Sequence, residues 1–162
     1  MHPRAADLIA RLGMLPHPEG GHFCEVFRSS TTVIPADART ARPAVTTIYF
    51  LLQSGEHSAL HRVLSDEIWH YYEGDQLDLV WWEPATDVVQ RHRLGPVADE
   101  QTRPVAVVPA RWWQAARTTG AYTLVGCTVG PGFDYADFTM MREDAHTARA
   151  LRERRPELLP FL

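Results

Sequence analysis

The chain has 162 residues, of which 45% are hydrophobic and 22% are charged, and its formal net charge is −4. This length and composition predict one globular domain, residues 1–162, that can bury a core without disulfide staples. No run of Lys or Arg suits a phosphate backbone, and no apolar run approaches the roughly 20 residues of a membrane helix, so neither nucleic acid nor membrane is an expected partner.

The predicted elements begin with a short helix over residues 3–13, where Leu8, Ile9 and Leu12 recur at helical spacing and Gly13 provides a stop. Short strand-like runs follow at residues 22–30, 44–53, 58–63, 67–72, 76–83, 87–94, 105–108, 112–117 and 121–129, with a loop at 34–43. Many short strands separated by Gly and Pro predict a barrel or sandwich. A second helix is predicted over residues 142–155, ended by Pro156. The class is therefore all-β, with a barrel over about residues 22–141 and short terminal helices.

The ends of the chain and its cysteines add two expectations. The N-terminus has no apolar run behind a basic start, which predicts no signal peptide and a cytoplasmic location. Cys24 and Cys127 lack the basic sequence neighbours that mark an activated thiol, so both are interpreted as core residues.

One stretch in the first half of the chain holds side chains suited to chemistry. His61 lies on a predicted strand and Glu67 begins the next one after a short turn, so a hairpin would bring the two side chains face to face. The same alternation carries Trp69 and Tyr71 to the side of Glu67. An imidazole beside a carboxylate can bind a divalent metal or act as the base in proton transfer.

The spacing of this stretch resembles the first motif of the cupin superfamily, which reads Gly, five residues, His-any-His, three or four residues, Glu, six residues and Gly. The matching positions are Gly55, His61, Glu67 and Gly74, with Val63 in place of the second His. In the second motif Pro109 matches, Gln114 stands in the His position, and Arg103 and Arg111 stand where the motif has Gly. The resemblance implies a double-stranded β-helix, or jelly-roll, barrel.

Further segments extend the resemblance along nearly the whole chain. They are His17-Pro18-Glu19-Gly20-Gly21, His61-Arg62, Asp66-Glu67-Ile68-Trp69-His70, Val108-Pro109 and Thr128-Val129-Gly130-Pro131-Gly132-Phe133. Together they resemble a largely uncharacterised cupin-like family catalogued as a domain of unknown function. That family implies a compact, RmlC-like barrel of the dTDP-ketosugar epimerase type that commonly pairs as a homodimer.

Metal binding is one interpretation of the motif positions. His61, Glu67 and Gln114 would be three ligands of one divalent ion (Fe, Mn, Ni or Zn), with open positions for water or substrate, as in a metal-dependent oxygenase. The alternative is a metal-free, hydrogen-bonded network in a polar pocket.

The preferred hypothesis is a non-redox isomerase, epimerase or lyase that acts on a small organic or sugar-like substrate. His61 would be the base and Tyr71 the acid, while Glu67 would orient His61 or stabilise its charged form. A non-catalytic small-molecule-binding protein would use the same pocket and remains a third possibility.

Five residues are predicted to contact the substrate. Glu19 and Arg28 form one candidate patch, in which Arg28 could hold a carboxylate or phosphate. His57 lies in the turn before His61, near the predicted barrel mouth. Trp69 and Trp112 would form an aromatic wall, which suits a flat or ring-shaped organic ligand.

Overall fold

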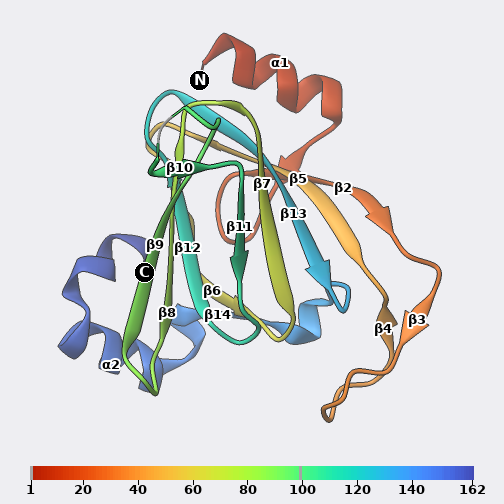
Figure 1. Cartoon of the computed structure of the whole chain (residues 1–162), viewed down its shortest axis with the longest axis vertical. Coiled ribbons are helices and arrows are strands. Elements are labelled where there is room, and N and C mark those ends of the chain that lie inside the picture. Colours follow the sequence, from red (N-terminus) through yellow and green to blue (C-terminus); the bar gives the residue numbers. More distant parts are fainter. Residues whose placement is uncertain (1, 99) are drawn as a thin grey trace.

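Two six-stranded sheets pack face to face in the computed structural model, which describes residues 2–98 and 100–162 (Figure 1). The first sheet runs in the order β1 (Leu15–Pro16), β2 (His22–Arg28), β5 (Thr46–Gln53), β13 (Tyr122–Gly130), β7 (Asp66–Gly74) and β11 (Val105–Val108). The second runs in the order β10 (Thr102–Arg103), β9 (Val88–Leu94), β8 (Leu77–Glu83), β12 (Trp113–Thr118), β6 (Ser58–Val63) and β14 (Phe138–Met140). A separate pair, β3 (Thr32–Val33) and β4 (Arg42–Pro43), extends from one edge. The architecture is the predicted all-β jelly roll.

The predicted elements are confirmed where the segment is long enough for its hydrophobic residues to recur at helix or strand spacing. β6 and β11 have the predicted bounds, and α1 (Pro3–Leu12) ends at Gly13 in the left-handed conformation. The second helix is shorter than predicted: α2 (Ala145–Arg154) follows a 3-10 turn, η2 (Met141–Glu143), because Asp144 caps its N-terminus. The strands that the sequence did not predict (β1, β3, β4, β10 and β14) have two or three residues, too few to show alternation.

β6 and β7 do not form the hairpin that the sequence predicted. β6 pairs with β12 and β14, whereas β7 pairs with β11 and β13, so the short connection between them crosses from one sheet to the other. His61 and Glu67 therefore face each other across the interior of the barrel and not along one hairpin.

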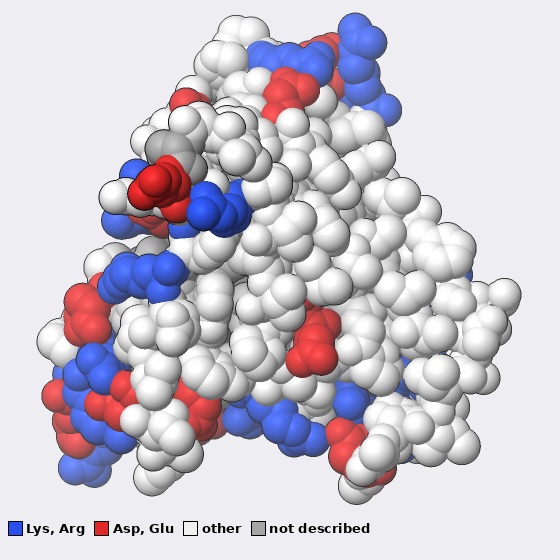
Figure 2. Space-filling model, in the orientation of Figure 1, with Lys and Arg blue, Asp and Glu red and all other residues white. Residues whose placement is uncertain are grey.

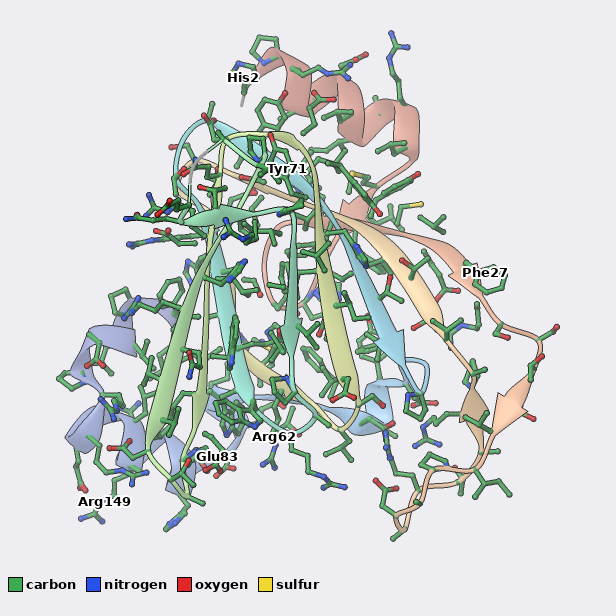
Figure 3. The ribbon with its side chains drawn as sticks, in the orientation of Figure 1. His2, Phe27, Arg62, Tyr71, Glu83 and Arg149 are labelled. Carbon is green, nitrogen blue, oxygen red and sulfur yellow. The ribbon has the colours of Figure 1, made fainter. Side chains whose placement is uncertain are left out.

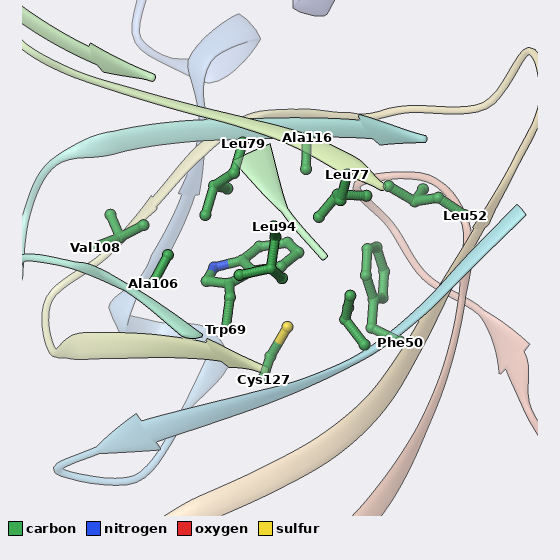
Figure 4. Packing of buried hydrophobic residues seen from close by; sticks show 11 residues of the cluster. Phe50, Leu52, Trp69, Leu77, Leu79, Leu94, Ala106, Val108, Ala116 and Cys127 are labelled. Carbon is green, nitrogen blue, oxygen red and sulfur yellow. The ribbon is translucent and has the colours of Figure 1, made fainter. Parts of the chain in front are cut away.

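The interior of the barrel is closed at one end by an apolar cluster around Phe50, Trp69, Leu77 and Leu79 (Figure 4). The outer face of the second sheet is covered by α2 and η3 (Pro156–Phe161), which pack on Trp82 and other buried side chains of that face. α1 covers one end of the first sheet. Apolar packing therefore fills one end of the barrel and leaves the other for a cavity.

Charged side chains gather at the rim of the face in Figure 2, and the centre of that face is largely uncharged. Tyr72, Val105 and Val107, from β7 and β11, are among the large side chains exposed at the surface. None of the described helices has the length and apolar character needed to cross a membrane.

A buried ion-pair network fixes the segment that precedes β14. Asp137, in η1 (Tyr135–Asp137), accepts two hydrogen bonds from Arg42, with Nε–Oδ2 and Nη2–Oδ1 distances of 2.9 and 2.8 Å. Arg39 adds a contact of 3.1 Å to the same carboxylate and donates to Ser65 at 2.8 Å. The network therefore ties η1 and the residues beside it to the β3–β4 segment and to the β6–β7 connection.

Asp137→Ala is expected to destabilise the protein, because it removes the buried carboxylate that accepts hydrogen bonds from Arg42 and Arg39. Urea unfolding followed by circular dichroism measures this change. The control is Asp7→Ala, which removes the exposed ion pairs of Asp7 with Arg4 and Arg11 and should have a much smaller effect. Equal effects of the two substitutions would contradict a structural role for the buried network.

Candidate functional site

A cavity of about 380 Å³ opens between the two sheets. Its lining residues come from β2, β5, β7 and β13 on one side and from β6 and β14 on the other. The polar side chains of its floor are buried: Glu19, His61 and Glu67 are at most 8% exposed. Apolar side chains such as Phe23 and Phe138 form the walls. The cavity thus holds ionisable groups in a largely apolar surrounding.

The turn before β2 places Glu19 in the cavity by packing directly on the start of β6. Gly20 has a φ of +110°, and a Cβ on it would lie 2.2 Å from the carbonyl oxygen of His57. The backbone N–H of Ala59 donates to the carbonyl of Glu19 at 2.8 Å. Only glycine permits this approach, so Gly20 is needed for Glu19 to reach His61.

Backbone contacts fix the protonation pattern of His61. Its Nδ1 lies 2.8 Å from the carbonyl oxygen of Ala59, which can only accept, so Nδ1 carries the hydrogen. In the neutral ring the lone pair is then on Nε2, which lies 3.3 Å from Oε2 of Glu19. The imidazole stacks on Phe138 with a centroid distance of 5.4 Å. Burial lowers the pKa of His61, which favours the neutral ring.

His17 lies beside the same carboxyl group. The backbone N–H of Glu19 donates to Nδ1 of His17 at 3.3 Å, so that nitrogen is an acceptor, and it lies 3.5 Å from Oε2 of Glu19. Ser58 donates to the other oxygen, Oε1, at 2.8 Å. Burial lowers the pKa of His17 and raises that of Glu19. Nε2 of His61 and Nδ1 of His17 thus both lie near Oε2 of Glu19, and because the backbone N–H already uses the lone pair of His17, a proton taken up here would be shared between His61 and Glu19.

Glu67 lies on the opposite sheet and is held by a chain of hydrogen bonds. Trp69 donates its indole N–H to Oε1 of Gln114 at 3.0 Å, and Gln114 donates its Nε2 to Oε2 of Glu67 at 2.6 Å. The Cys127 thiol also contacts the carboxyl group. Burial raises the pKa of Glu67 to about 7, against the lesser effect of nearby His61.

The chemistry of the donor set does not fit the metal site predicted from His61, Glu67 and Gln114. An indole N–H can only donate, so Trp69 fixes the amide oxygen of Gln114 toward itself and leaves an NH₂ group facing Glu67. An NH₂ group is not a metal ligand. Among the described residues, no group of three or more His, Cys, Asp or Glu side chains has an arrangement that could hold a metal ion. The assignment of Gln114 as a ligand is therefore corrected to a hydrogen-bond donor.

The structure brings only some of the predicted substrate contacts to the cavity. Glu19 and Arg28 line it together with His61 and Glu67, so the two patches predicted separately are one site. Trp69 is fully buried in the apolar cluster, and Trp112 packs against that cluster.

Two further predicted residues, Tyr71 and His57, are not among the residues that line the cavity. Tyr71 follows Trp69 along β7 and lies near the α1 end of the barrel, far from Arg62 at the other end (Figure 3). Its hydroxyl donates to the carbonyl of Gly74 at 2.6 Å. The ring of His57 packs edge-on against Phe161 instead of facing the cavity.

Sequence reasoning missed several residues of the cavity. His17 stands two positions before Glu19 in a segment that was noticed for its turn chemistry, so that segment carried the signal. Cys127 is buried as predicted, but it also lines the cavity. Burial raises the pKa of its thiol well above the ordinary value. Phe133 was noticed only as the end of a segment that carries the family resemblance, and Tyr135 and Phe138 gave no signal because they lie in a short segment without alternation.

Comparisons with known proteins agree with this architecture. The model of a family described as Cupin superfamily (DUF985) matches residues 6–141. A hypothetical protein from Leishmania major is 34% identical, with a TM-score of 0.82, over 94% of this chain and 93% of that one. A protein from Shewanella oneidensis is 31% identical, with a TM-score of 0.81, over 93% and 92% of the two chains. Oxalate decarboxylase from Bacillus subtilis shares the fold at 10% identity, with a TM-score of 0.57, over 78% of this chain and 29% of that one. A search of the curated proteins found no match.

Glu67→Gln is expected to stabilise the protein at alkaline pH. Because its pKa is raised from 4.5 to about 7 in the folded state, Glu67 favours folding below pH 4.5, and this contribution is lost as the pH rises through 7. Each pKa unit corresponds to about 1.4 kcal/mol, so the variant should gain roughly 3 kcal/mol over the wild type above pH 8 and little at pH 4.

Urea unfolding at several pH values tests this expectation. The matched control is Glu73→Gln, because hydrogen bonds from Arg4 and Tyr122 lower the pKa of Glu73 to about 2. That variant should instead lose stability near neutral pH. A pH-independent difference between wild type and Glu67→Gln would contradict the raised pKa.

Metal content gives a second test. Protein purified without a tag or nickel resin, incubated with Fe²⁺, Mn²⁺, Ni²⁺ or Zn²⁺ and then dialysed, is expected to retain far less than one equivalent by elemental analysis. Near-stoichiometric metal that is lost in His61→Ala would contradict this and would restore the predicted ligand cluster.

Proposed function

Because the chain belongs to the DUF985 family of the cupin superfamily, we propose that it is a small-molecule-binding cupin that catalyses a non-redox proton transfer in this cavity. The reaction class is an isomerisation, epimerisation or elimination on a small organic substrate. The observation that carries the proposal is the convergence of His61 Nε2 and His17 Nδ1 on one oxygen of Glu19, at 3.3 and 3.5 Å. Such a cluster can take up a proton at the buried floor of the cavity.

Glu19 and His61 would act as one base unit. Removal of a proton from a carbon next to a carbonyl group places that proton between Nε2 of His61 and Oε2 of Glu19. Ser58 keeps the carboxyl group in place through Oε1, and Ala59 keeps the imidazole in the matching tautomer. The role predicted for Glu67, as the carboxylate partner of His61, thus belongs better to Glu19.

Glu67 would act as the acid from the opposite sheet. With its pKa raised to about 7, a large fraction of the carboxyl group is protonated near neutral pH and can donate to a developing enolate oxygen. The proton returns to Glu67 when the enol collapses, and the base unit delivers its proton to the same or a neighbouring carbon. The Gln114–Trp69 chain fixes the carboxyl group for this transfer.

Exchange of carbon-bound hydrogen with D₂O, followed by proton NMR, tests the proposal on a panel of small enolisable ketones of neutral, cationic and anionic charge, with 1-indanone as the neutral member. His61→Gln and Glu67→Gln should each lower the exchange rate by about 100-fold or more, because positioned acids and bases contribute on that scale. Exchange in the wild type should fall as the pH rises above about 7, and this limb should vanish in Glu67→Gln.

Two further variants separate the alternatives. Glu73→Gln, on the protein surface, serves as the control and should keep the wild-type rate. Tyr71→Phe should also keep it, and a loss as large as that of Glu67→Gln would return the acid role to Tyr71. Binding of ketones in the cavity without any exchange would contradict the proposed catalytic activity and identify a non-catalytic binding protein.

A further inference from the structure

Three aromatic rings form a corner at the more exposed side of the cavity. Phe133 and Tyr135 lie 5.0 Å apart at 81°, Tyr135 and Phe138 lie 6.1 Å apart at 79°, and Phe133 and Phe138 lie 5.9 Å apart at 67°. All three residues line the cavity, and Tyr135 is 56% exposed. These are edge-to-face contacts between packed rings, one face of Phe138 is covered by His61, and a ring face that is open to the cavity attracts a cation.

The charged residues of the cavity are mostly acidic. Its lining includes the four carboxyl groups of Glu19, Glu25, Glu67 and Asp134, and a single arginine, Arg28. Two of these acids lie on the buried floor, and Asp134 stands between two residues of the aromatic corner in the sequence. Burial raises the pKa of Glu19 and of Glu67, so the floor readily holds protons, and the negative charge that a ligand meets at the mouth is that of Asp134.

Arg28 is already engaged, and its charge is balanced by that of Glu25. Its Nε and Nη2 donate to the two oxygens of Glu25 at 3.1 and 2.7 Å, and its Nη1 donates to the carbonyl of Phe133 at 3.0 Å. The charge of Asp134 also acts on this guanidinium. A carboxylate or phosphate on a substrate would have to displace Glu25, so the anion-binding role predicted for Arg28 is disfavoured.

We propose that the substrate of this cavity is a small organic cation, whose ammonium group sits in the corner formed by Phe133, Tyr135 and Phe138, beside Asp134. This inference rests on the proposed function, because the part of the substrate that exchanges a carbon-bound proton would extend from this corner toward His61 and Glu67. A phosphate group in this corner would be repelled by Asp134, so phosphate-bearing substrates such as nucleotide sugars are disfavoured.

Three probes of matched shape test the charge preference: choline, its neutral isostere 3,3-dimethyl-1-butanol, and 3,3-dimethylbutanoate. Isothermal titration calorimetry on the intact protein at pH 7.5 should give a Kd for choline at least about tenfold below that of the alcohol, with the carboxylate weakest. Equal affinity for choline and the alcohol, tighter binding of the carboxylate, or no binding of any probe would each overturn the proposal.

Variants assign the preference to the corner. Tyr135→Leu keeps an apolar side chain without a ring face, and Asp134→Asn keeps the cap on the backbone N–H of Ala136 without the charge. Each should reduce the ratio of choline affinity to alcohol affinity by about three-fold or more. Tyr72→Leu, on the outer sheet face, makes the matched change elsewhere and should leave the ratio unchanged. An unchanged ratio in both corner variants would overturn the assignment.

The two proposals fail separately. A protein that exchanges ketone protons but binds choline and the alcohol equally keeps the proposed reaction and loses the cation inference. A protein that prefers choline but exchanges no ketone, whatever its charge, keeps the cation inference and loses the proposed reaction.

Discussion

The close packing of the turn before β2 on the first residues of β6 is the contact on which the site depends. Gly20 has no side chain to hold the two segments apart, and its place beside the carbonyl of His57 sets the position of Glu19. That position brings a carboxyl group beside the rings of His17 and His61. A larger residue at this glycine would separate the acid from its imidazoles and would remove the shared proton.

The rest of the barrel supports this contact by keeping ionisable groups in an apolar interior. The cluster around Phe50 and Trp69 closes one end, and the ion pair of Asp137 with Arg42 anchors the segment that carries the aromatic corner. Burial acts on acids and imidazoles in opposite directions: it raises the pKa of Glu67 and lowers that of His61. Burial thus reverses their usual order: Glu67 holds a proton more tightly than His61, which favours a protonated Glu67 beside a neutral imidazole but costs folding stability when Glu67 ionises.

The replacement of motif histidines changes the chemistry of the site as well as its ligand count. At Gln114 the neighbouring indole of Trp69 decides which end of the amide faces the cavity floor, and it selects the donor end. The side chain in the motif position thus stabilises a carboxylate and not a metal ion. The relatives from Leishmania major and Shewanella oneidensis share the fold over nearly their full length, whereas the similarity to oxalate decarboxylase concerns the fold alone.

The sequence by itself determined the class of fold, most strand positions, and the importance of Glu19, His61 and Glu67. Period-two alternation, turn residues and motif spacing are local properties, so they can be read along one chain. Only the tertiary structure decided which of these side chains meet. The crossing of the chain from β6 to β7 placed His61 and Glu67 on different sheets, and Tyr71 lies toward the α1 end of the barrel, outside the lining of the cavity. Contacts between residues distant in sequence, such as Glu19 with His61 or Gln114 with Trp69, depend on how the two sheets pack. A pattern of neighbouring residues cannot predict that packing.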